Sequence, residues 1–502
     1  MPASTTETAS ARTPKPRPSR STRAGQATPQ AAQPRQLMYN FRGVYDRELT
    51  HGVAHAAGLH FGHYYRERAG HSKPVIMVAC DHRYSSPSLK HFVAHGLLRA
   101  GCKVKDVGCL PTSVVAYAAS RLGDGACVIT ASHNPPEYNG LKFFESSGAV
   151  VKPEVEDNLL GRVLADSRDF SGDDGVSLAG YELCDPGEII QSYVEEAAAA
   201  AAPEGEIRVA VDGRFGLANL VMPQLLDRLG CERHAIHERL HPYFLDSKGE
   251  YVDPEPKSDN VQALQQLVRD GDFDLGLAFD GDADRAVIVD DTGAYLPDDL
   301  VLLALALEYG DKSRPRVITV DSSLMVEREL RARGYTLIIS PVGDPFVAER
   351  VQRAGASFGG VPNGHYIFPD FLVYSDGMFT AAMMVRITAA LRAQGQTLSQ
   401  FIRGLPATTI CKRRSPFGRT KEEFEAKVAP QLRDMFRCHC AHLDYLETDD
   451  AVVAGWGDGL KLLVRYNRWD NNFNVQAESL SSPDEAHAAF EEVLATISRA
   501  IA

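Results

Sequence analysis

The stretch Pro74-Val-Ile-Met-Val-Ala79 is apolar throughout, and it is followed by a helical hydrophobic period over Leu89–Ala100 and a second strand pattern at Lys103–Val107. A strand that is apolar on both faces indicates a parallel sheet covered on both sides by helices. The same alternation returns three times, the last time in a weaker form: Ile207–Val211 with Leu220–Leu229, Val317–Val320 with Leu324–Arg333, and Asp458–Val464. This rhythm predicts an α/β protein built from repeated strand–helix units.

The length of 502 residues suits three or four domains of roughly 100–200 residues each. We predict three mixed α/β sandwich domains and a smaller C-terminal α+β domain that ends in a helix at Pro483–Ala502. The predicted segments are a basic tail at 1–36, α/β domains at 37–185, 186–304 and 305–405, and the C-terminal domain at 406–502.

The formal charge of −13 is unevenly distributed, because residues 1–36 carry six Arg and Lys against one Glu. Once this +5 is taken out, the rest of the chain carries −18. A body this acidic repels phosphate backbones and anionic lipid surfaces, so neither nucleic acid nor a membrane is an expected partner. A membrane span is not expected either, since no stretch has the roughly 20 apolar residues that it needs.

Residues 1–36 hold six prolines and no aromatic, Ile, Leu or Val side chain. They cannot bury enough apolar surface to offset the entropy of ordering, which predicts a disordered tail. An organelle transit peptide is the alternative, but the prolines would break its amphipathic helix. The nine scattered cysteines are typical of reduced thiols, so we expect a cytoplasmic protein.

A loop with reactive side chains, Thr130-Ala-Ser-His-Asn-Pro-Pro-Glu-Tyr-Asn-Gly-Leu-Lys142, follows the predicted buried strand Ala126–Ile129. Open α/β sheets present their reactive groups at this carboxyl end of the strands. The imidazole of His133 can move protons and the ammonium of Lys142 can neutralise phosphate charge, so both suit a Ser132 hydroxyl that exchanges a phosphoryl group. On composition alone, an ordinary Asn-Pro turn with a surface serine is the alternative.

A second loop, Asp280-Gly-Asp-Ala-Asp-Arg285, joins two apolar strands at Leu275–Phe279 and Ala286–Val289. Alternating aspartates in a turn can direct three carboxylates at one point, and such hard oxygen ligands suit Mg²⁺. An EF-hand does not fit, because Arg285 stands at its glycine position and Asp291 at its glutamate position. The other alternative is a solvated acidic hairpin, in which the carboxylates would repel one another without a cation.

Together the two loops describe a serine that exchanges a phosphoryl group beside a divalent ion. With both loops in this order, the sequence resembles the α-D-phosphohexomutases, the family of phosphoglucomutase and phosphomannomutase, from about residue 41 to residue 478. The matching segments are Phe41-Arg-Gly-Val44, Asp81-His-Arg-Tyr-Ser-Ser-Pro87, the two loops, and Gly359–His365. The resemblance implies three α/β domains and one C-terminal domain around a central cleft.

The same resemblance implies a reaction and its residues. The family moves a phosphate between two hydroxyls of a sugar phosphate through a serine phosphate and a bisphosphate intermediate, with a hexose 1,6-bisphosphate as an activator. The implied catalytic residues are Arg42, Ser132, His133, Lys142 and Arg285, and the implied Mg²⁺ ligands are Asp280, Asp282, Asp284 and the phosphoserine at Ser132. The expected partner is a phosphorylated sugar or a related small molecule, and we expect a monomer or a dimer.

The substrate-reading loops differ from the family pattern. The family's sugar loop usually reads Gly-Glu-x-Ser-Gly/Ala-His, whereas here it is Gly360-Val-Pro-Asn-Gly-His365. A valine replaces the acid and Asn363 the serine, while His365 is kept. A buried valine cannot accept hydroxyl hydrogen bonds, which predicts a different recognition of the sugar. In the third domain, Pro341-Val-Gly-Asp-Pro-Phe346 lacks the family's Lys or His, and Asp344 would repel a phosphate.

The C-terminal phosphate loop differs most. The family usually has Arg-x-Ser-Gly/Asn-Thr-Glu/x-Pro, and this chain has Arg465-Tyr-Asn-Arg-Trp-Asp-Asn471. Its two guanidiniums can still clamp a phosphate or a carboxylate, and Trp469 can stack on a ring unless it packs within its own domain. The nearby Lys412-Arg413-Arg414 is more typical of a solvated strand edge than of a site. The predicted substrate-binding residues are Asn363, His365, Arg465, Asn467, Arg468 and Trp469.

The residues for phosphoryl transfer match the family pattern, whereas the substrate-binding loops differ from it. This combination favours an Mg²⁺-dependent phosphomutase with an atypical sugar phosphate as its substrate. Two alternatives stay open. The weakened phosphate loop would also suit a phosphatase or one-way phosphotransferase that acts on a sugar- or nucleotide-like phosphate. The fold could instead bind a phosphorylated metabolite as a non-catalytic regulator, with the basic tail as its partner-binding arm.

Overall fold

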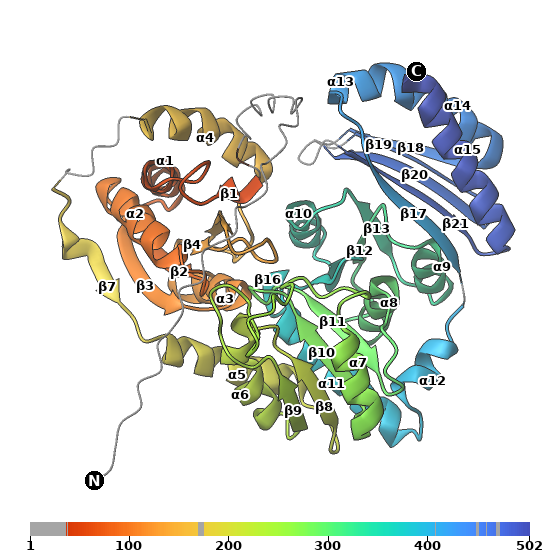
Figure 1. The fold of residues 1–502 in the computed structure, drawn as a ribbon, viewed down its shortest axis with the longest axis horizontal. Helices are drawn as coiled ribbons and strands as arrows, with labels where there is room; N and C mark the ends of the chain where they lie inside the picture. Colours follow the sequence, from red (N-terminus) through yellow and green to blue (C-terminus); the bar gives the residue numbers. More distant parts are fainter. Residues whose placement is uncertain are drawn as a thin grey trace, which may run out of the picture. The chain divides into compact units, whose positions relative to one another are not determined.

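The computed structural model describes residues 37, 39–168, 175–406, 408–447, 451–457, 459–467 and 472–501, so the predicted tail at 1–36 lies outside the described residues. Within this part of the chain there are four sheets of four or five strands (Figure 1). A two-stranded ribbon joins β1 (Gly43–Val44) to β5 (Tyr138–Asn139). The single-turn elements are η1 (Tyr39–Phe41), η2 (Leu178–Gly180) and η3 (Leu217–Leu220).

The first sheet has the strand order β6-β4-β2-β3-β7, with parallel pairing except at the edge strand β6. Its strands are β2 (Val75–Cys80), β3 (Lys103–Cys109), β4 (Gly125–Ile129), β6 (Leu141–Glu145) and β7 (Tyr181–Leu183), and its helices are α1 (His51–Arg68), α2 (Ser86–Arg99), α3 (Thr112–Leu122) and α4 (Pro153–Asp166). Ile76 and Val78 of β2 join the core of α1 and α2, whereas Met77 and Ala79 join the core that contains α3. The predicted coverage of this strand on both faces is therefore confirmed.

The second sheet has the order β11-β10-β8-β9, again with one antiparallel edge, at β11. Its strands are β8 (Arg208–Asp212), β9 (Glu232–Ile236), β10 (Leu275–Phe279) and β11 (Ala286–Asp290), and its helices are α5 (Pro186–Ala201), α6 (Met222–Arg228) and α7 (Gln262–Gly271). Helix α7 packs on one face, while the core on the other face holds residues of α5 and α6. The loop predicted to bind a metal follows the carboxyl end of β10.

The third sheet has the order β13-β12-β14-β15-β16. Its strands are β12 (Arg316–Thr319), β13 (Leu337–Ser340), β14 (Phe358–Val361), β15 (His365–Phe368) and β16 (Leu372–Ser375), and the nearby helices are α8 (Asp298–Glu308), α9 (Leu324–Ala332), α10 (Asp344–Ala354), α11 (Gly377–Ala393) and α12 (Leu398–Arg403). The predicted boundary between the second and third domains, at residue 304, falls inside α8, and α8 packs on α9 and β14. Helix α11 returns from the third sheet to pack on β10 and β11 of the second.

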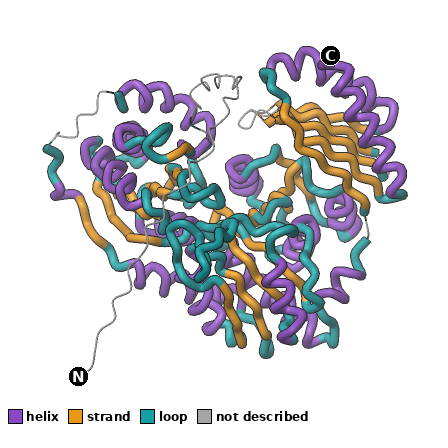
Figure 2. The backbone as a smooth tube through the Cα atoms, viewed as in Figure 1, coloured by secondary structure: helices purple, strands orange, loops and turns teal. Residues whose placement is uncertain are grey.

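The C-terminal sheet, β17-β21-β20-β19-β18, is antiparallel throughout. It consists of β17 (Thr409–Pro416), β18 (His442–Glu447), β19 (Ala451–Trp456), β20 (Leu460–Asn467) and β21 (Asn472–Ser479), with α13 (Lys421–Glu423), the π-helix η4 (Phe424–Val428), α14 (Ala429–His439) and α15 (Pro483–Ile501). Its helices lie on one face (Figure 2). The predicted fourth repeat near Asp458–Val464 is therefore wrong, because β20 pairs with its neighbours as hairpins; the predicted α+β class is confirmed.

An aromatic series ties the first three sheets together. The ring centroids of Tyr117 in α3 and Tyr193 in α5 are 5.4 Å apart, and Tyr193 lies 5.5 Å from Phe371. Phe371 in turn stacks on Phe379 of α11 at 4.1 Å. Since these rings belong to one continuous buried cluster, the three sheets share a core. In the described part of the chain, no helix is both long and apolar enough for a membrane span.

The buried carboxyl of Glu156 in α4 predicts a pH-dependent stability. Burial raises its pKa to about 8, and the backbone N–H of Asn40 donates to it at 3.0 Å. The unfolded chain loses this proton near pH 4.5 and the folded chain near pH 8, so the Glu156 contribution to stability falls as the pH rises between these values. We expect Glu156→Gln to be increasingly more stable than the wild type from about pH 5 to about pH 8.

Thermal melting followed by fluorescence across this pH range measures the effect. Glu154→Gln is the matched control, because Glu154 is exposed on the first turn of the same helix. A constant difference in melting temperature between Glu156→Gln and the wild type at every pH would contradict the prediction.

Candidate active site

The serine loop begins directly after β4, and its backbone is held in an uncommon conformation. Ser132 has φ of 52°, in the left-handed region that non-glycine residues rarely adopt. Its N–H donates to Thr130 Oγ1 at 2.8 Å, and its carbonyl accepts from Arg83 Nη2 at 2.8 Å. The Arg83 guanidinium is fully buried, pairs with Asp81 at 3.0 Å, and also donates to the carbonyl of Asn134 at 2.7 Å. The left-handed turn is thus fixed by neighbours that satisfy its backbone groups.

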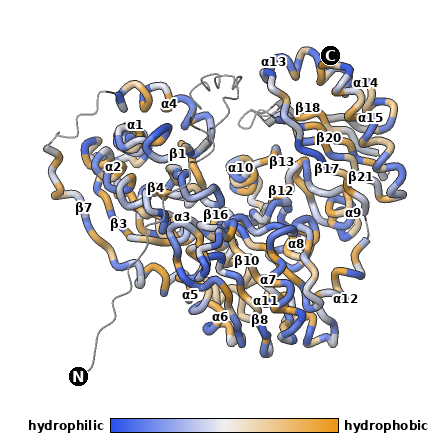
Figure 3. Tube along the Cα trace, in the orientation of Figure 1, coloured by the Kyte–Doolittle hydropathy of each residue, from blue (hydrophilic) through white to orange (hydrophobic). Residues whose placement is uncertain are grey.

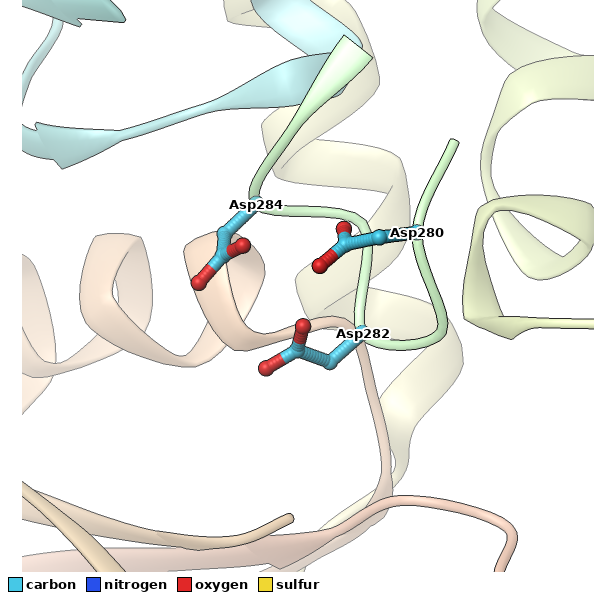
Figure 4. Close-up of side chains that lie close together, drawn as sticks. All are labelled: Asp280, Asp282 and Asp284. Atoms are coloured by element: carbon cyan, nitrogen blue, oxygen red, sulfur yellow. The ribbon is translucent and has the colours of Figure 1, made fainter. Parts of the chain in front are cut away.

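The metal loop after β10 approaches the serine loop closely. A Cβ at Gly281 would lie 2.5 Å from the carbonyl oxygen of Ser132, so only glycine allows the two loops this contact. As a result, Ser132 Oγ donates to Asp280 Oδ2 at 2.7 Å. The side chains of Asp280, Asp282 and Asp284 point toward one another, and each offers an oxygen within 4.8 Å of the others (Figure 4).

Lys142 at the start of β6 offsets the charge of two of these aspartates. Its ammonium donates to Asp282 Oδ2 at 2.9 Å and to Asp284 Oδ2 at 2.7 Å. Thr112 Oγ1 donates to the same Asp282 oxygen at 2.6 Å, and the Tyr374 hydroxyl donates to Asp284 Oδ2 at 2.7 Å. Burial alone would lower the pKa of Lys142, but the two carboxylates outweigh it and raise that pKa. The ammonium therefore stays charged inside the site.

The donor set fits a divalent cation of the magnesium type. Burial raises the pKa of Asp280 to about 7, and the charge of Asp284 adds to this rise. Burial would also raise the pKa of Asp284, but Lys142 and His365 outweigh it and hold that pKa well below its ordinary value. Among the described residues, the buried oxygen Asp282 Oδ1 has no hydrogen-bond partner. Asp284 Oδ1 is in the same state, and three carboxylates that repel one another, two of them with an oxygen that lacks a hydrogen-bond partner, suit Mg²⁺.

Arg285 joins the metal loop to the serine loop. Its Nε donates to Asp280 Oδ2 and its Nη1 to Glu255 Oε1, both at 3.2 Å, and its Nη2 donates to His133 Nδ1. Because a guanidinium only donates, His133 Nδ1 is an acceptor, and it lies 3.0 Å from Ser132 Oγ. Burial and the charge of Arg285 hold the pKa of His133 well below its ordinary value. The single lone pair of His133 Nδ1 is thus taken by Arg285, and Asp280, to which the Ser132 hydroxyl donates, is the group placed to receive the Ser132 proton.

The sugar-loop histidine lies between two carboxylates. His365 Nε2 is 3.5 Å from Asp284 Oδ1 and 3.6 Å from Asp344 Oδ2, and its Nδ1 is 3.0 Å from Asn363 Oδ1. Burial lowers the pKa of His365, but Asp344 and Asp284 outweigh it and raise that pKa. Asp344 therefore has His365 as a neighbour, which when protonated offsets the repulsion predicted from the sequence position of Asp344. Val361 is buried at the end of β14.

Of the remaining predicted site residues, one contacts the serine loop and the others lie elsewhere or outside the described residues. Arg42 Nη1 donates to Asn134 Oδ1 at 3.1 Å, which joins it to the serine loop. Arg465 lines a cavity on the C-terminal sheet whose lining includes neither Ser132 nor the three aspartates. Arg468, Trp469 and the side chain of Asn467 lie outside the described residues.

Four residues of the site were assigned no role from the sequence. Arg83 lies in a segment that carried the family resemblance, so its role could have been inferred from that motif. Thr112, Tyr374 and Glu255 come from three separate segments, and they reach the site only through tertiary contacts. Nothing in their local sequence distinguishes them from ordinary surface or core residues.

Three family models match the chain, and together they span most of it. Their descriptions are phosphoglucomutase/phosphomannomutase alpha/beta/alpha domain I for residues 38–169, domain II for residues 191–293, and domain III for residues 297–409. These matches cover the second and third sheets and the first sheet apart from β7. The family models thus agree with the three α/β sheets and their helices described above.

Named relatives give the same result. A probable phosphoglucosamine mutase of Methanothermobacter thermautotrophicus is 33% identical over 392 residues, which cover 78% of this chain and 82% of the relative. A phosphoglucomutase/phosphomannomutase of Thermococcus kodakarensis is 33% identical over 398 residues, covering 78% and 84%. Among solved structures, a phosphoglucomutase/phosphomannomutase family protein of Burkholderia thailandensis has a TM-score of 0.75 and 26% identity, covering 92% of this chain and 96% of its own.

The fold, the site and these relatives define an enzyme that transfers phosphoryl groups. The chain belongs to the phosphoglucomutase/phosphomannomutase family, which confirms the resemblance to the α-D-phosphohexomutases. It is a phosphomutase, and its family moves a phosphoryl group between positions of a sugar phosphate.

The buried Arg83 predicts that the serine loop depends on one side chain. Arg83→Met removes its hydrogen bonds to the loop carbonyls and leaves the Asp81 charge buried without its partner. We expect a stability loss of about 3–5 kcal/mol, because breaking a buried ion pair leaves an uncompensated charge. Denaturant unfolding measures the loss. Arg47→Met is the control, since the Arg47 side chain is 73% exposed, and equal effects of both substitutions would contradict the prediction.

Proposed function

We propose that Ser132 carries the phosphoryl group that this phosphomutase transfers. The observation that carries the proposal is the position of Ser132 Oγ, 2.7 Å from Asp280 Oδ2 and 3.0 Å from His133 Nδ1. Asp280, to which the hydroxyl donates, can take the proton as Oγ attacks phosphorus and can return it when the phosphate leaves. The left-handed turn supports this role, because it holds the hydroxyl of Ser132 against the metal loop.

The charges around Ser132 support a transfer that depends on neutralisation. Asp280, Asp282 and Asp284 would hold Mg²⁺, which when bound neutralises phosphate charge. Lys142 and Arg285 add fixed positive charge against Asp284 and Asp280. Phosphoryl transfer requires little else of a protein beyond positioning and charge neutralisation. We assign Arg42 to the same task, since it is joined to the serine loop at Asn134.

For the substrate, we propose a sugar phosphate whose hydroxyls are recognised without a carboxylate side chain from the sugar loop. Val361 is 2% exposed and cannot accept a hydrogen bond. Asn363 is exposed beside His365, and these two would make the remaining polar contacts with the sugar. Since several relatives are named phosphoglucosamine mutases, an amino-sugar phosphate is a rational first substrate to test.

Replacement of Ser132 tests the phosphoryl carrier. We expect phosphate on Ser132 in intact-mass spectra of the purified protein, and a loss of isomerisation by Ser132→Ala of about 10³-fold or more. The assay is a coupled screen of hexose, pentose and amino-sugar phosphates with glucose 1,6-bisphosphate as activator. Ser146→Ala is the control, because Ser146 is an exposed serine of the same domain.

Two outcomes would argue against this function. Turnover by Ser132→Ala at the wild-type rate would exclude the serine as carrier. Release of free phosphate in step with substrate consumption, without an isomer, would favour the phosphatase alternative.

Thr112 predicts a measurable effect on metal affinity. Its hydroxyl donates to Asp282 Oδ2, so Thr112→Val removes a bond that orients a proposed ligand while it preserves the shape of the side chain. Losses of this kind typically weaken metal binding by about 10–100-fold. Calorimetric titration with Mg²⁺ measures the affinity, and Thr112→Ser should restore it. Equal affinity in Thr112→Val and the wild type would contradict the prediction.

A further inference from the structure

The turn that precedes Arg42 has a strained backbone. Asn40 and Phe41 have φ of 60° and 47°, so two consecutive non-glycine residues lie in the left-handed region. Residues with a large side chain rarely adopt this conformation, and it persists only where the surrounding structure fixes the backbone. Because such strain clusters at functional sites, the contacts that hold this turn are candidates for a role in the reaction.

Both residues of the turn are held by contacts with the rest of the first domain. The ring of Phe41 is 3% exposed and packs edge-on against Phe61 and Phe143, with ring centroids 6.0 Å and 6.3 Å away. The backbone N–H of Asn40 donates to Glu156 Oε2 at 3.0 Å. The apolar core thus anchors one residue of the turn, and a carboxyl group from α4 anchors the other.

Glu156 is buried although it belongs to a helix with an exposed face. The tube of α4 alternates between hydrophilic and hydrophobic residues in Figure 3, as is typical of such a helix. Glu156 and Val163 lie about two helical turns apart on its buried face, and Val163 joins the core that contains α1. A buried acid lowers stability near neutral pH, so packing alone does not explain this residue.

Polar atoms around the turn lack hydrogen bonds. Among the described residues, Asn40 Oδ1, Arg42 Nε and Glu156 Oε1 are buried without a hydrogen-bond partner. Burial raises the pKa of Glu156 to about 8, although the bond from Asn40 and the charge of Arg42 act against this rise, so the carboxyl group is largely neutral at pH 7. A neutral carboxyl group can donate from its second oxygen, whereas an amide oxygen accepts. The groups that Glu156 and Asn40 leave unpaired are thus complementary.

The turn directs Arg42 at the serine loop. A Cβ at Gly140 would lie 2.9 Å from Arg42 Cγ and 3.1 Å from the carbonyl oxygen of Asn40, so the turn packs directly on the end of that loop. Arg42 Nη1 then donates to Asn134 Oδ1 at 3.1 Å. Burial holds the pKa of His133 well below its ordinary value, and the charge of Arg42 adds to this effect. A change in the turn would therefore move a charge that acts on the serine loop.

We propose that Glu156 positions Arg42 for phosphoryl transfer by holding the left-handed turn at Asn40. This inference rests on the proposed function, in which Arg42 neutralises phosphate charge. Glu156 acts through the turn, so it is a positioning residue and not a catalytic one. A misplacement of about 1 Å at a reacting group can cost about 10²-fold in rate, which makes the effect of such an anchor measurable.

Glu156→Met and Glu156→Gln test the proposal in the full chain. The thioether of methionine is only a weak acceptor, so we expect kcat/KM for the sugar phosphate to fall by about 10–100-fold in Glu156→Met. A glutamine offers both an acceptor and a donor, so Glu156→Gln should keep kcat/KM within about threefold of the wild-type value. Glu154→Met is the matched control, because Glu154 is exposed on the first turn of α4, and it should behave like the wild type.

A double-mutant cycle with Arg42→Met separates positioning from a general loss of structure. If Glu156 acts through Arg42, adding Glu156→Met to Arg42→Met should lower kcat/KM by less than about twofold further. Thermal melting checks that all variants are folded. Crystal structures of the variants give a readout that does not depend on turnover. We expect the distance from Arg42 Nη1 to Asn134 Oδ1 to exceed about 3.5 Å in Glu156→Met and to be kept in Glu156→Gln.

Several results would each overturn the inference. Wild-type kcat/KM in Glu156→Met would leave the turn without an effect on the reaction. The full loss from Glu156→Met on top of Arg42→Met would make its role structural, and an equal loss in Glu156→Gln would exclude the hydrogen bond as its means. An unchanged contact between Arg42 and Asn134 in Glu156→Met would exclude positioning. If the wild type turns over no sugar phosphate, the proposed function fails, and the crystal structures still decide whether Glu156 positions Arg42.

Discussion

Three buried carboxylates held within 4.8 Å of one another are the constraint on which the rest of the structure depends. Their repulsion must be offset, and Arg285 of the same loop offsets it at Asp280, while Lys142 of the first sheet offsets it at Asp282 and Asp284. The first and second sheets are therefore joined by the same ion pairs that make the site. This requirement also explains Gly281, because the loops can approach closely enough only without a side chain there.

The docking of the two loops gives Ser132 its geometry. A left-handed serine costs free energy, and such strain persists only where the surroundings fix the backbone. Here Arg83 and Thr130 satisfy the carbonyl and the N–H of that residue. The nucleophile is thus held in place before any substrate arrives, so its alignment does not have to be achieved during the reaction.

Local pattern predicted the fold well, and it predicted the site in part. The apolar strands and the alternating aspartates are properties of short segments, so β2, β10 and the metal loop could be read directly from the sequence. Thr112 bonds to a residue 170 positions away, and that contact exists only once two sheets have docked. The prediction of a fourth strand–helix repeat near Asp458–Val464 failed for the same reason. An apolar strand looks alike in a parallel and an antiparallel sheet, and only its partners distinguish the two.

The C-terminal sheet is fixed to the third by buried charges as well as by apolar contacts. The fully buried Glu478 accepts from Ser323 Oγ at 2.5 Å and from the N–H of Leu324 at 2.8 Å, at the start of α9. Lys461 donates to the carbonyl of Ser322 at 2.6 Å. Because breaking these contacts would leave buried charges unpaired, β20 and β21 are held firmly against the third sheet.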